Sequence, residues 1–204
     1  MKKIVFILIS LFSFIFIKNV SAVEMEISAK SAILVDFNTG KVLYSKNENE
    51  PLAMASMTKL MSMLLIMEKI DDGSLKYDDI VEISTESSSM GGSQIFLNPG
   101  DKYKVIDLLK GVAMASANDA VVALAEKTYG SKEHFIEAMN KKAESLGLKN
   151  THFVNVHGLD EEGHYSSAYD MSVMARELLK HEKILDFTRV YEEYLTKPDG
   201  SQIW

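Results

Sequence analysis

Ser56-Met57-Thr58-Lys59 opens a stretch, residues 56–70, that is helical in composition and apolar on nearly every side. A helix without a polar face belongs inside a domain, so this segment is predicted to be buried, with its methionines filling the core. Ser56 and Lys59 share one face at the helix start, close enough to interact. A serine needs a neighbouring base, and a lysine can act as one when burial or positive charge lowers its pKa. The spacing indicates a nucleophile and its base, with a capping serine near a solvated lysine as the alternative.

The rest of the chain predicts a mixed α+β architecture. Two strand-like runs flank Asn38-Thr39-Gly40 and predict a β-hairpin, which needs further strands or a helix to pack on. Helical periodicity and end signals follow, with loops between them. The expected segments are hairpin strands at 32–37 and 41–45, helices at about 105–112, 119–128, 132–146 and 167–179, and loops over 84–93 and 150–166. The Ser167–Asp170 spacing predicts a capping box.

The first 22 residues have the pattern of a secretory signal peptide. Lys2 and Lys3 precede an apolar run that ends before Lys18, and Val20-Ser21-Ala22 offers a small-residue cleavage site. The run is shorter than the roughly 20 residues of a spanning helix, so a membrane anchor is the weaker interpretation. We therefore expect a signal peptide over residues 1–22 and one domain over 23–204, exported to the cell envelope.

Charge and composition exclude several function classes. The 204 residues carry a formal net charge of −7, and removal of the signal peptide with its three lysines takes this to −10. An acidic exported domain is a poor candidate for binding nucleic acid or anionic lipid through a basic face. There is no cysteine, so disulfides and thiolate metal sites are excluded. His152 and His157 lack metal-ligand spacing, and no metal or cofactor is expected.

A second chemical element is Ser116-Ala117-Asn118, at the junction of two predicted helices. Small residues surround this junction and allow other groups to approach closely. Serine and asparagine between helices are usually capping residues, and that is the alternative interpretation.

Taken together, the motifs resemble a known family. The matching stretches are Ala55-Ser56-Met57-Thr58-Lys59, Gly92-Ser93-Gln94-Ile95-Phe96-Leu97, Pro99-Gly100, Ser116-Ala117-Asn118-Asp119-Ala120, residues 146–153, His157-Gly158-Leu159-Asp160 and Tyr165-Ser166-Ser167-Ala168. They resemble the serine-type D-alanyl-D-alanine carboxypeptidases, the low-molecular-mass penicillin-binding proteins of peptidase family S11. The resemblance covers essentially all of the chain after the signal peptide.

The resemblance implies a β-lactamase/transpeptidase-like fold, with a helical block and an antiparallel sheet. It also implies removal of the terminal D-Ala from peptidoglycan pentapeptide stems through an acyl-enzyme, with β-lactams as covalent inhibitors. Ser56 would be the acylated nucleophile, Lys59 its base and Ser116 a proton relay towards the leaving D-alanine. Asn118 would bind the substrate's peptide backbone, and the Ser56 N–H would form half of an oxyanion hole.

The chain departs from the family pattern in one important respect. It lacks the Lys-Thr-Gly motif, because Lys127-Thr128 is followed by Tyr129 at a predicted helix end. We therefore expect a fragment that stops before the later sheet strands and a C-terminal membrane anchor, and that is inactive or nearly so as written. Two alternatives stay open: a serine β-lactamase with Glu161 or Glu162 as the deacylating group, and a non-catalytic penicillin-binding wall protein.

Overall fold

The computed structural model describes residues 27–198 and 200–203. The predicted signal peptide, residues 1–22, lies outside this part of the chain. The described residues combine helices with antiparallel strand pairs, as the α+β prediction requires. Within the same residues, no helix has the length and apolar character needed to cross a membrane.

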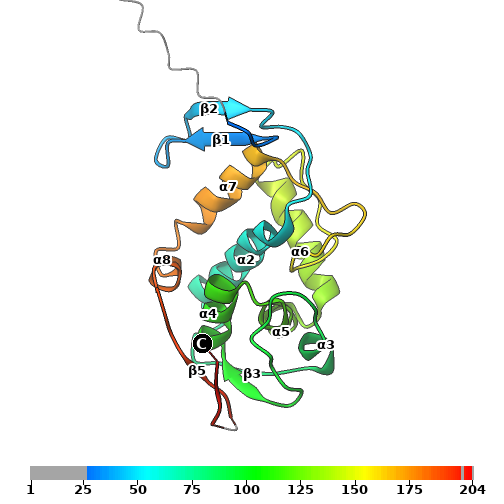
Figure 1. Cartoon of the computed structure of the whole chain (residues 1–204), viewed down its shortest axis with the longest axis vertical. Helices are drawn as coiled ribbons and strands as arrows, with labels where there is room; N and C mark the ends of the chain where they lie inside the picture. Colours follow the sequence, from blue (N-terminus) through cyan, green and yellow to red (C-terminus); the bar gives the residue numbers. More distant parts are fainter. Residues whose placement is uncertain (1–26, 199, 204) are drawn as a thin grey trace, which may run out of the picture.

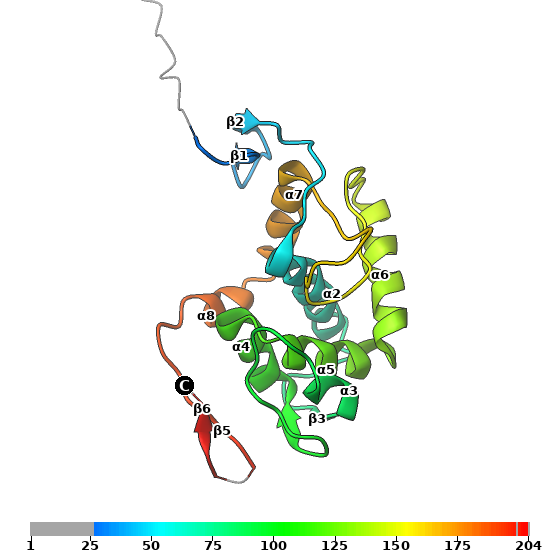
Figure 2. The same ribbon diagram turned by 45° about the vertical axis from the view of Figure 1, so that its right-hand side comes forward.

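The helix α2 (Lys59–Asp71) lies in the middle of the helical block (Figures 1 and 2). A short 3-10 helix, η1 (Ala55–Thr58), leads directly into it. Helix α2 contacts α5 (Asn118–Tyr129), α6 (Lys132–Ser145) and α7 (Ala168–Leu178). The prediction of a buried helix is confirmed, because eight of its residues are buried, in a nearly unbroken run from Lys59 to Met67.

Helix ends follow the predicted signals. Helix α4 (Val105–Ala115) ends at Ser116, which adopts a left-handed conformation with φ 55°, and α5 begins two residues later. The Ser167 hydroxyl accepts a hydrogen bond from the Asp170 N–H and caps α7. The other half of the predicted capping box is wrong, because the Asp170 carboxylate accepts hydrogen bonds from the Asn150 N–H and the Thr151 hydroxyl, both at 2.8 Å, instead of turning back to the Ser167 N–H. Asp170 thus fastens the loop before α7 in addition to lying in its first turn.

The predicted hairpin is present as β1 (Ala32–Val35) and β2 (Val42–Lys46), paired antiparallel and packed on α7. Two further strand pairs and a short helix were not predicted, since their segments of two to five residues are too short to show periodicity. They are β3 (Ile80–Glu82) with β4 (Lys102–Lys104), β5 (Leu195–Thr196) with β6 (Gln202–Ile203), and α8 (Ile184–Thr188).

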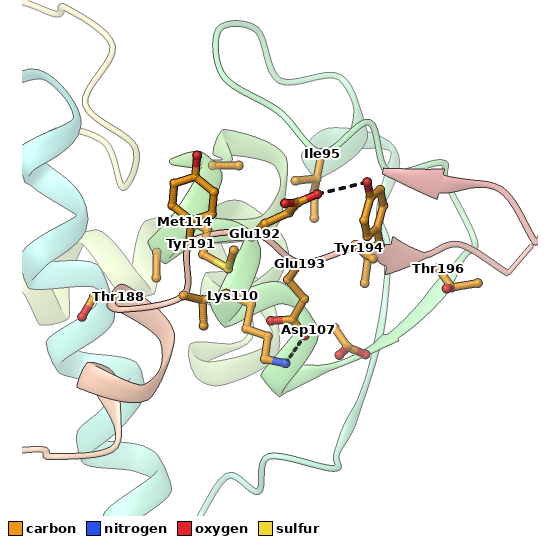
Figure 3. A pocket seen from close by; sticks show the side chains of 15 residues that line it. Ile95, Asp107, Lys110, Met114, Thr188, Tyr191, Glu192, Glu193, Tyr194 and Thr196 are labelled. Atoms are coloured by element: carbon orange, nitrogen blue, oxygen red, sulfur yellow. Dashed lines mark hydrogen bonds and ion pairs between the residues drawn. The ribbon is translucent and has the colours of Figure 1, made fainter. Parts of the chain in front are cut away.

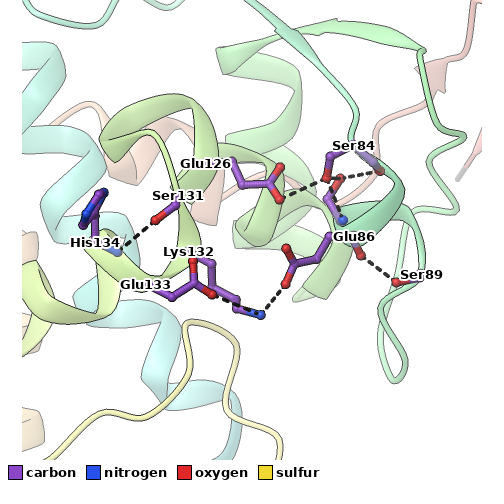
Figure 4. Close-up of polar contacts among 9 residues, drawn as sticks. Ser84, Glu86, Ser89, Glu126, Ser131, Lys132, Glu133 and His134 are labelled. Carbon is purple, nitrogen blue, oxygen red and sulfur yellow. Dashed lines mark hydrogen bonds and ion pairs between the residues drawn. The ribbon is translucent and has the colours of Figure 1, made fainter.

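The prediction of a continuous loop over 84–93 is wrong at its start, where α3 (Thr85–Ser88) forms. Ser84 caps this helix and also donates to the Glu126 carboxylate of α5 at 3.0 Å (Figure 4). Lys132 of α6 forms an ion pair with Glu86 in the same polar cluster. These contacts hold α3 against α5 and α6, a tertiary effect that the short sequence of α3 does not reveal.

Residues 150–166 form the predicted long loop, without a helix or a named strand. Two isolated bridges, Leu52 with Ser166 and His152 with Tyr165, fix its ends. We call residues 150–166 the buttress loop, because its central part packs against η1 and the start of α2.

Candidate active site

Ser56 lies in a tight turn whose backbone is strained at Ala55. We call residues 54–59 the nucleophile turn. Ala55 has φ 48°, a left-handed conformation that costs an L-residue other than glycine roughly 1–2 kcal/mol. Ser56 is exposed at the surface of this turn, whereas Thr58 and Lys59 are buried. The turn therefore presents the serine hydroxyl outward and the lysine amine from inside the domain.

The structure brings Ser56 and Lys59 together. The Lys59 Nζ lies 3.2 Å from the Ser56 Oγ and donates to the His157 carbonyl oxygen at 2.7 Å. Lys59 is only 2% exposed, and burial lowers its pKa from 10.5 to about 8. A buried amine that loses its proton near pH 8, within reach of a hydroxyl, has the properties of a general base.

The buttress loop supports this arrangement from behind. A Cβ atom on Gly158, which has φ 92°, would lie 2.0 Å from the Ala55 carbonyl oxygen, so only glycine fits there. The Asn155 side-chain oxygen accepts from the N–H groups of His157 and Gly158, at 3.3 and 2.7 Å. These bonds fix the His157 carbonyl that receives the Lys59 amine.

The second predicted element lies at the α4–α5 junction. The Asn118 side chain donates to the Gly91 carbonyl at 2.7 Å, and its backbone N–H donates to Ser93 at the same distance. Within the described part of the chain, the Ser116 Oγ and the Asn118 Oδ1 are buried and have no hydrogen-bond partner. Buried polar atoms are normally satisfied, so these two are available to a ligand. Ser116 is not hydrogen-bonded to Ser56 or Lys59 in this structure.

Asp119 is a supporting residue whose role the sequence did not reveal. Its fully buried carboxylate accepts from the N–H groups of Ile95 and Leu97, at 3.2 and 3.1 Å, and from Ala120 at 2.9 Å. Between them, Phe96 has φ 55° and is 64% exposed. Asp119 thus fastens residues 95–97, next to the residues 91 and 93 that Asn118 contacts. An acidic residue in the first turn of α5 was the available signal, but it gave no indication of these partners.

A cavity of about 570 Å³ lies elsewhere, between α4 and residues 188–196 (Figure 3). Lys110 and Glu193 form an ion pair across it, and the Tyr194 hydroxyl donates to Glu192. None of the four predicted site residues lines this cavity, although Met114 and Ala115 lead from it to Ser116. Among residues 27–198 and 200–203, no cluster of three His, Asp or Glu side chains is placed to hold a metal ion.

With this geometry in place, the comparison with known proteins is direct. Residues 18–203 match the family model of the S11 peptidases, described as D-alanyl-D-alanine carboxypeptidase. The chain belongs to this family. The carboxypeptidase DacF of Bacillus subtilis is 59% identical over 181 residues, covering 89% of this chain and 46% of that protein. The carboxypeptidase DacD of Escherichia coli is 41% identical over 174 residues, covering 82% and 44%.

Solved structures of a D-alanyl-D-alanine carboxypeptidase and of a penicillin binding protein share the fold. A D-alanyl-D-alanine carboxypeptidase DacD from Francisella tularensis superposes with a TM-score of 0.84 at 30% identity, covering 88% of this chain and 44% of that one. Penicillin binding protein 6B from Escherichia coli gives 0.80 at 37% identity, covering 91% and 59%. The predicted transpeptidase-like fold is confirmed. The chain spans about half the length of the curated relatives it matches.

Proposed function

We propose that this chain carries the nucleophile and base of a serine D-alanyl-D-alanine carboxypeptidase. The contact between the buried Lys59 amine and the Ser56 hydroxyl, at 3.2 Å, is the observation that carries the proposal. The family membership supports the substrate class, peptidoglycan stem peptides ending in D-Ala-D-Ala. Residues 23–204 would form part of the catalytic domain, delivered outside the cytoplasm by a signal peptide cleaved after Ala22.

In the first step, neutral Lys59 takes the proton of Ser56 as the serine oxygen attacks the carbonyl carbon of the penultimate D-alanine. The Ser56 N–H stabilises the developing oxyanion. The C–N bond to the terminal D-alanine then breaks, and the departing amine receives a proton along a path through Ser116. Water hydrolyses the ester on Ser56 and releases the shortened peptide. The two buried oxygens without partners, Ser116 Oγ and Asn118 Oδ1, suit the roles of relay and peptide-binding group.

A serine β-lactamase would also need a group that activates the deacylating water. Glu161 and Glu162, the two candidates in the sequence, are both exposed, and Glu161 accepts a hydrogen bond from the Asn155 side chain at 3.1 Å. In this position Glu161 braces the buttress loop, which favours the carboxypeptidase over a β-lactamase that uses Glu161.

The test is D-alanine release from a diacetylated L-Lys-D-Ala-D-Ala tripeptide by protein made from the complete reading frame. We expect release by the wild type, none by Ser56→Ala, and a stable benzylpenicillin adduct on Ser56 by mass spectrometry. Rapid penicillin turnover without D-alanine release would instead establish a β-lactamase. A folded protein that forms the adduct but releases no D-alanine would indicate a non-catalytic penicillin-binding protein.

A further inference from the structure

His164 forms one end of a hydrogen-bond chain that leads to the nucleophile turn. The Val154 N–H donates to the His164 Nδ1 at 3.1 Å, so that nitrogen carries no proton. The proton of the neutral ring is therefore on Nε2, which lies 2.8 Å from the Thr58 Oγ1. The Thr58 hydroxyl in turn donates to the Ala55 carbonyl oxygen at 2.8 Å. All three hydrogen bonds therefore run in the same direction, from the buttress loop towards the nucleophile turn.

The last acceptor of these hydrogen bonds is the Ala55 carbonyl oxygen, which belongs to the peptide group between Ala55 and Ser56. The Ala55 carbonyl and the Ser56 N–H are parts of the same planar unit, and in a trans peptide they point in opposite directions. Cis peptide bonds are absent from the described residues, and this peptide follows the left-handed Ala55. A hydrogen bond that fixes the Ala55 oxygen therefore also fixes the direction of the Ser56 N–H.

We propose that His164 is a positioning residue that acts through Thr58 to aim the Ser56 N–H at the oxyanion. This inference rests on the proposed function, which assigns that N–H to the oxyanion hole. His164 acts only as the neutral Nε2–H form, because a protonated ring would turn an Nδ1–H towards the Val154 N–H. The ring is 6% exposed and packs edge-on against Phe153.

The electrostatic surroundings keep the ring neutral at physiological pH. Burial lowers the pKa of His164, and the neighbouring His152 lowers it further. The carboxylates of Glu161 and Asp160 oppose this shift and favour the charged ring. Acidification should therefore switch off the hydrogen-bond chain below the ordinary histidine range, well separated from the titration of Lys59.

The test compares the rate of Ser56 acylation by benzylpenicillin in four proteins made from the complete reading frame. They are the wild type, His164→Leu, His164→Gln, whose amide N–H can still donate to Thr58, and His134→Leu on the exposed surface of α6 as the control. We expect His164→Leu to lower the acylation rate constant about tenfold to hundredfold, with the non-covalent affinity for penicillin unchanged, because an oxyanion donor acts in the transition state. His164→Gln should recover most of the rate, and at acid pH its rate should fall only as far as protonation of Lys59 requires, without the additional loss that protonation of His164 causes in the wild type.

A double mutant separates positioning from general damage. If His164 acts only through Thr58, adding Thr58→Val to His164→Leu should cost no more than either change alone. Additive losses, or a His164→Leu protein that acylates at the wild-type rate, would overturn the proposal. Nitrogen-15 NMR gives a readout independent of catalysis: we expect an Nε2–H ring at pH 7. If Ser56 is never acylated, the proposed function fails, while an Nδ1–H ring would refute the positioning role alone.

Discussion

Gly158 lies against Ala55 so closely that a Cβ atom on the glycine would fall within 2.0 Å of the alanine's carbonyl oxygen. The two residues are 103 positions apart, and their contact joins the buttress loop to the nucleophile turn. Backbone opposes backbone here, so no side chain can move aside to relieve a clash.

Gly158→Ala should therefore abolish acylation of Ser56 and lower the melting temperature. Gly163→Ala is a matched control, since Gly163 also has a left-handed φ, 83°, but the nearest atom to its Cβ would be 3.7 Å away. The control carries the conformational cost of about 1 kcal/mol without the clash. Equal effects of the two substitutions, by penicillin binding and thermal denaturation, would show that the contact with Ala55 is unimportant.

Acylation should depend on the protonation of Lys59. Burial lowers the pKa of its amine to about 8, so the second-order rate constant for benzylpenicillin should rise as pH increases to about 8 and then level off. Lys59→Arg keeps the positive charge and cannot accept the proton, and it should reduce the rate at least about a hundredfold. A rate in the wild type that is flat between pH 6 and 9 would contradict the role of Lys59 as base.

The same burial has a consequence for stability. Between pH 8 and 10.5 the unfolded chain holds a proton on Lys59 that the folded protein has released. Because the unfolded state binds more protons, the free energy of unfolding should rise with pH over this range. Urea denaturation at pH 8 and 9.5 measures the effect, and Lys59→Met should remove the contribution of this residue. If the free energy of unfolding rises with pH no more steeply in the wild type than in Lys59→Met, Lys59 does not cause the rise.

Acid should destabilise the buttress loop. Burial, reinforced by the charge of Lys59, lowers the pKa of His157 from 6.5 to about 4. In this window the unfolded chain gains a proton that the folded chain does not, so the free energy of unfolding should fall as pH drops from 6.5 to 4. His157→Asn keeps an acceptor for the Leu159 N–H and cannot titrate. This variant should show a smaller fall in the free energy of unfolding between pH 6.5 and 4, and the remaining fall is the part that His164 contributes. An unchanged fall would show that His157 is not its cause.

Asp119→Asn should loosen residues 95–97. The substitution replaces an acceptor oxygen by an NH₂ group facing backbone N–H donors, and we expect a loss of about 2–3 kcal/mol in the free energy of unfolding. Asp78→Asn is the control: its carboxylate is 82% exposed and pairs with Lys104, a contact worth at most about 1 kcal/mol. Hydrogen exchange at Ile95 and Leu97 should quicken in the first variant only.

Sequence patterns predicted the elements whose signals are local. The buried helix, the hairpin and the cap at Ser167 depend on residues within a few positions of one another, and each is present. Strands of two or three residues carry no usable period, and α3 depends on contacts with Glu126 and Lys132, so both kinds of element were missed.

The site was predicted in part. Ser56 and Lys59 are neighbours on one helical turn, and their contact follows from spacing alone. The supports of that pair did not follow, because the His157 carbonyl, Gly158 and His164 reach it from about a hundred residues further along the chain. Every residue has a backbone carbonyl, so the sequence does not show that Lys59 bonds the carbonyl of His157. The roles assigned to Ser116 and Asn118 stay predictions, which D-alanine release by their alanine variants would measure.

The distance in sequence between Lys59 and His157 gives the site a built-in order of assembly. An amine in an unfolded chain is solvated and keeps its ordinary basicity, so Ser56 is then an unreactive alcohol. The amine becomes a usable base only after residues 155–158 have docked on the start of α2. A chain that is still unfolded, or one misfolded at the buttress loop, therefore lacks the base that Ser56 needs to react. Covalent labelling by a fluorescent penicillin would count only the molecules that have finished folding.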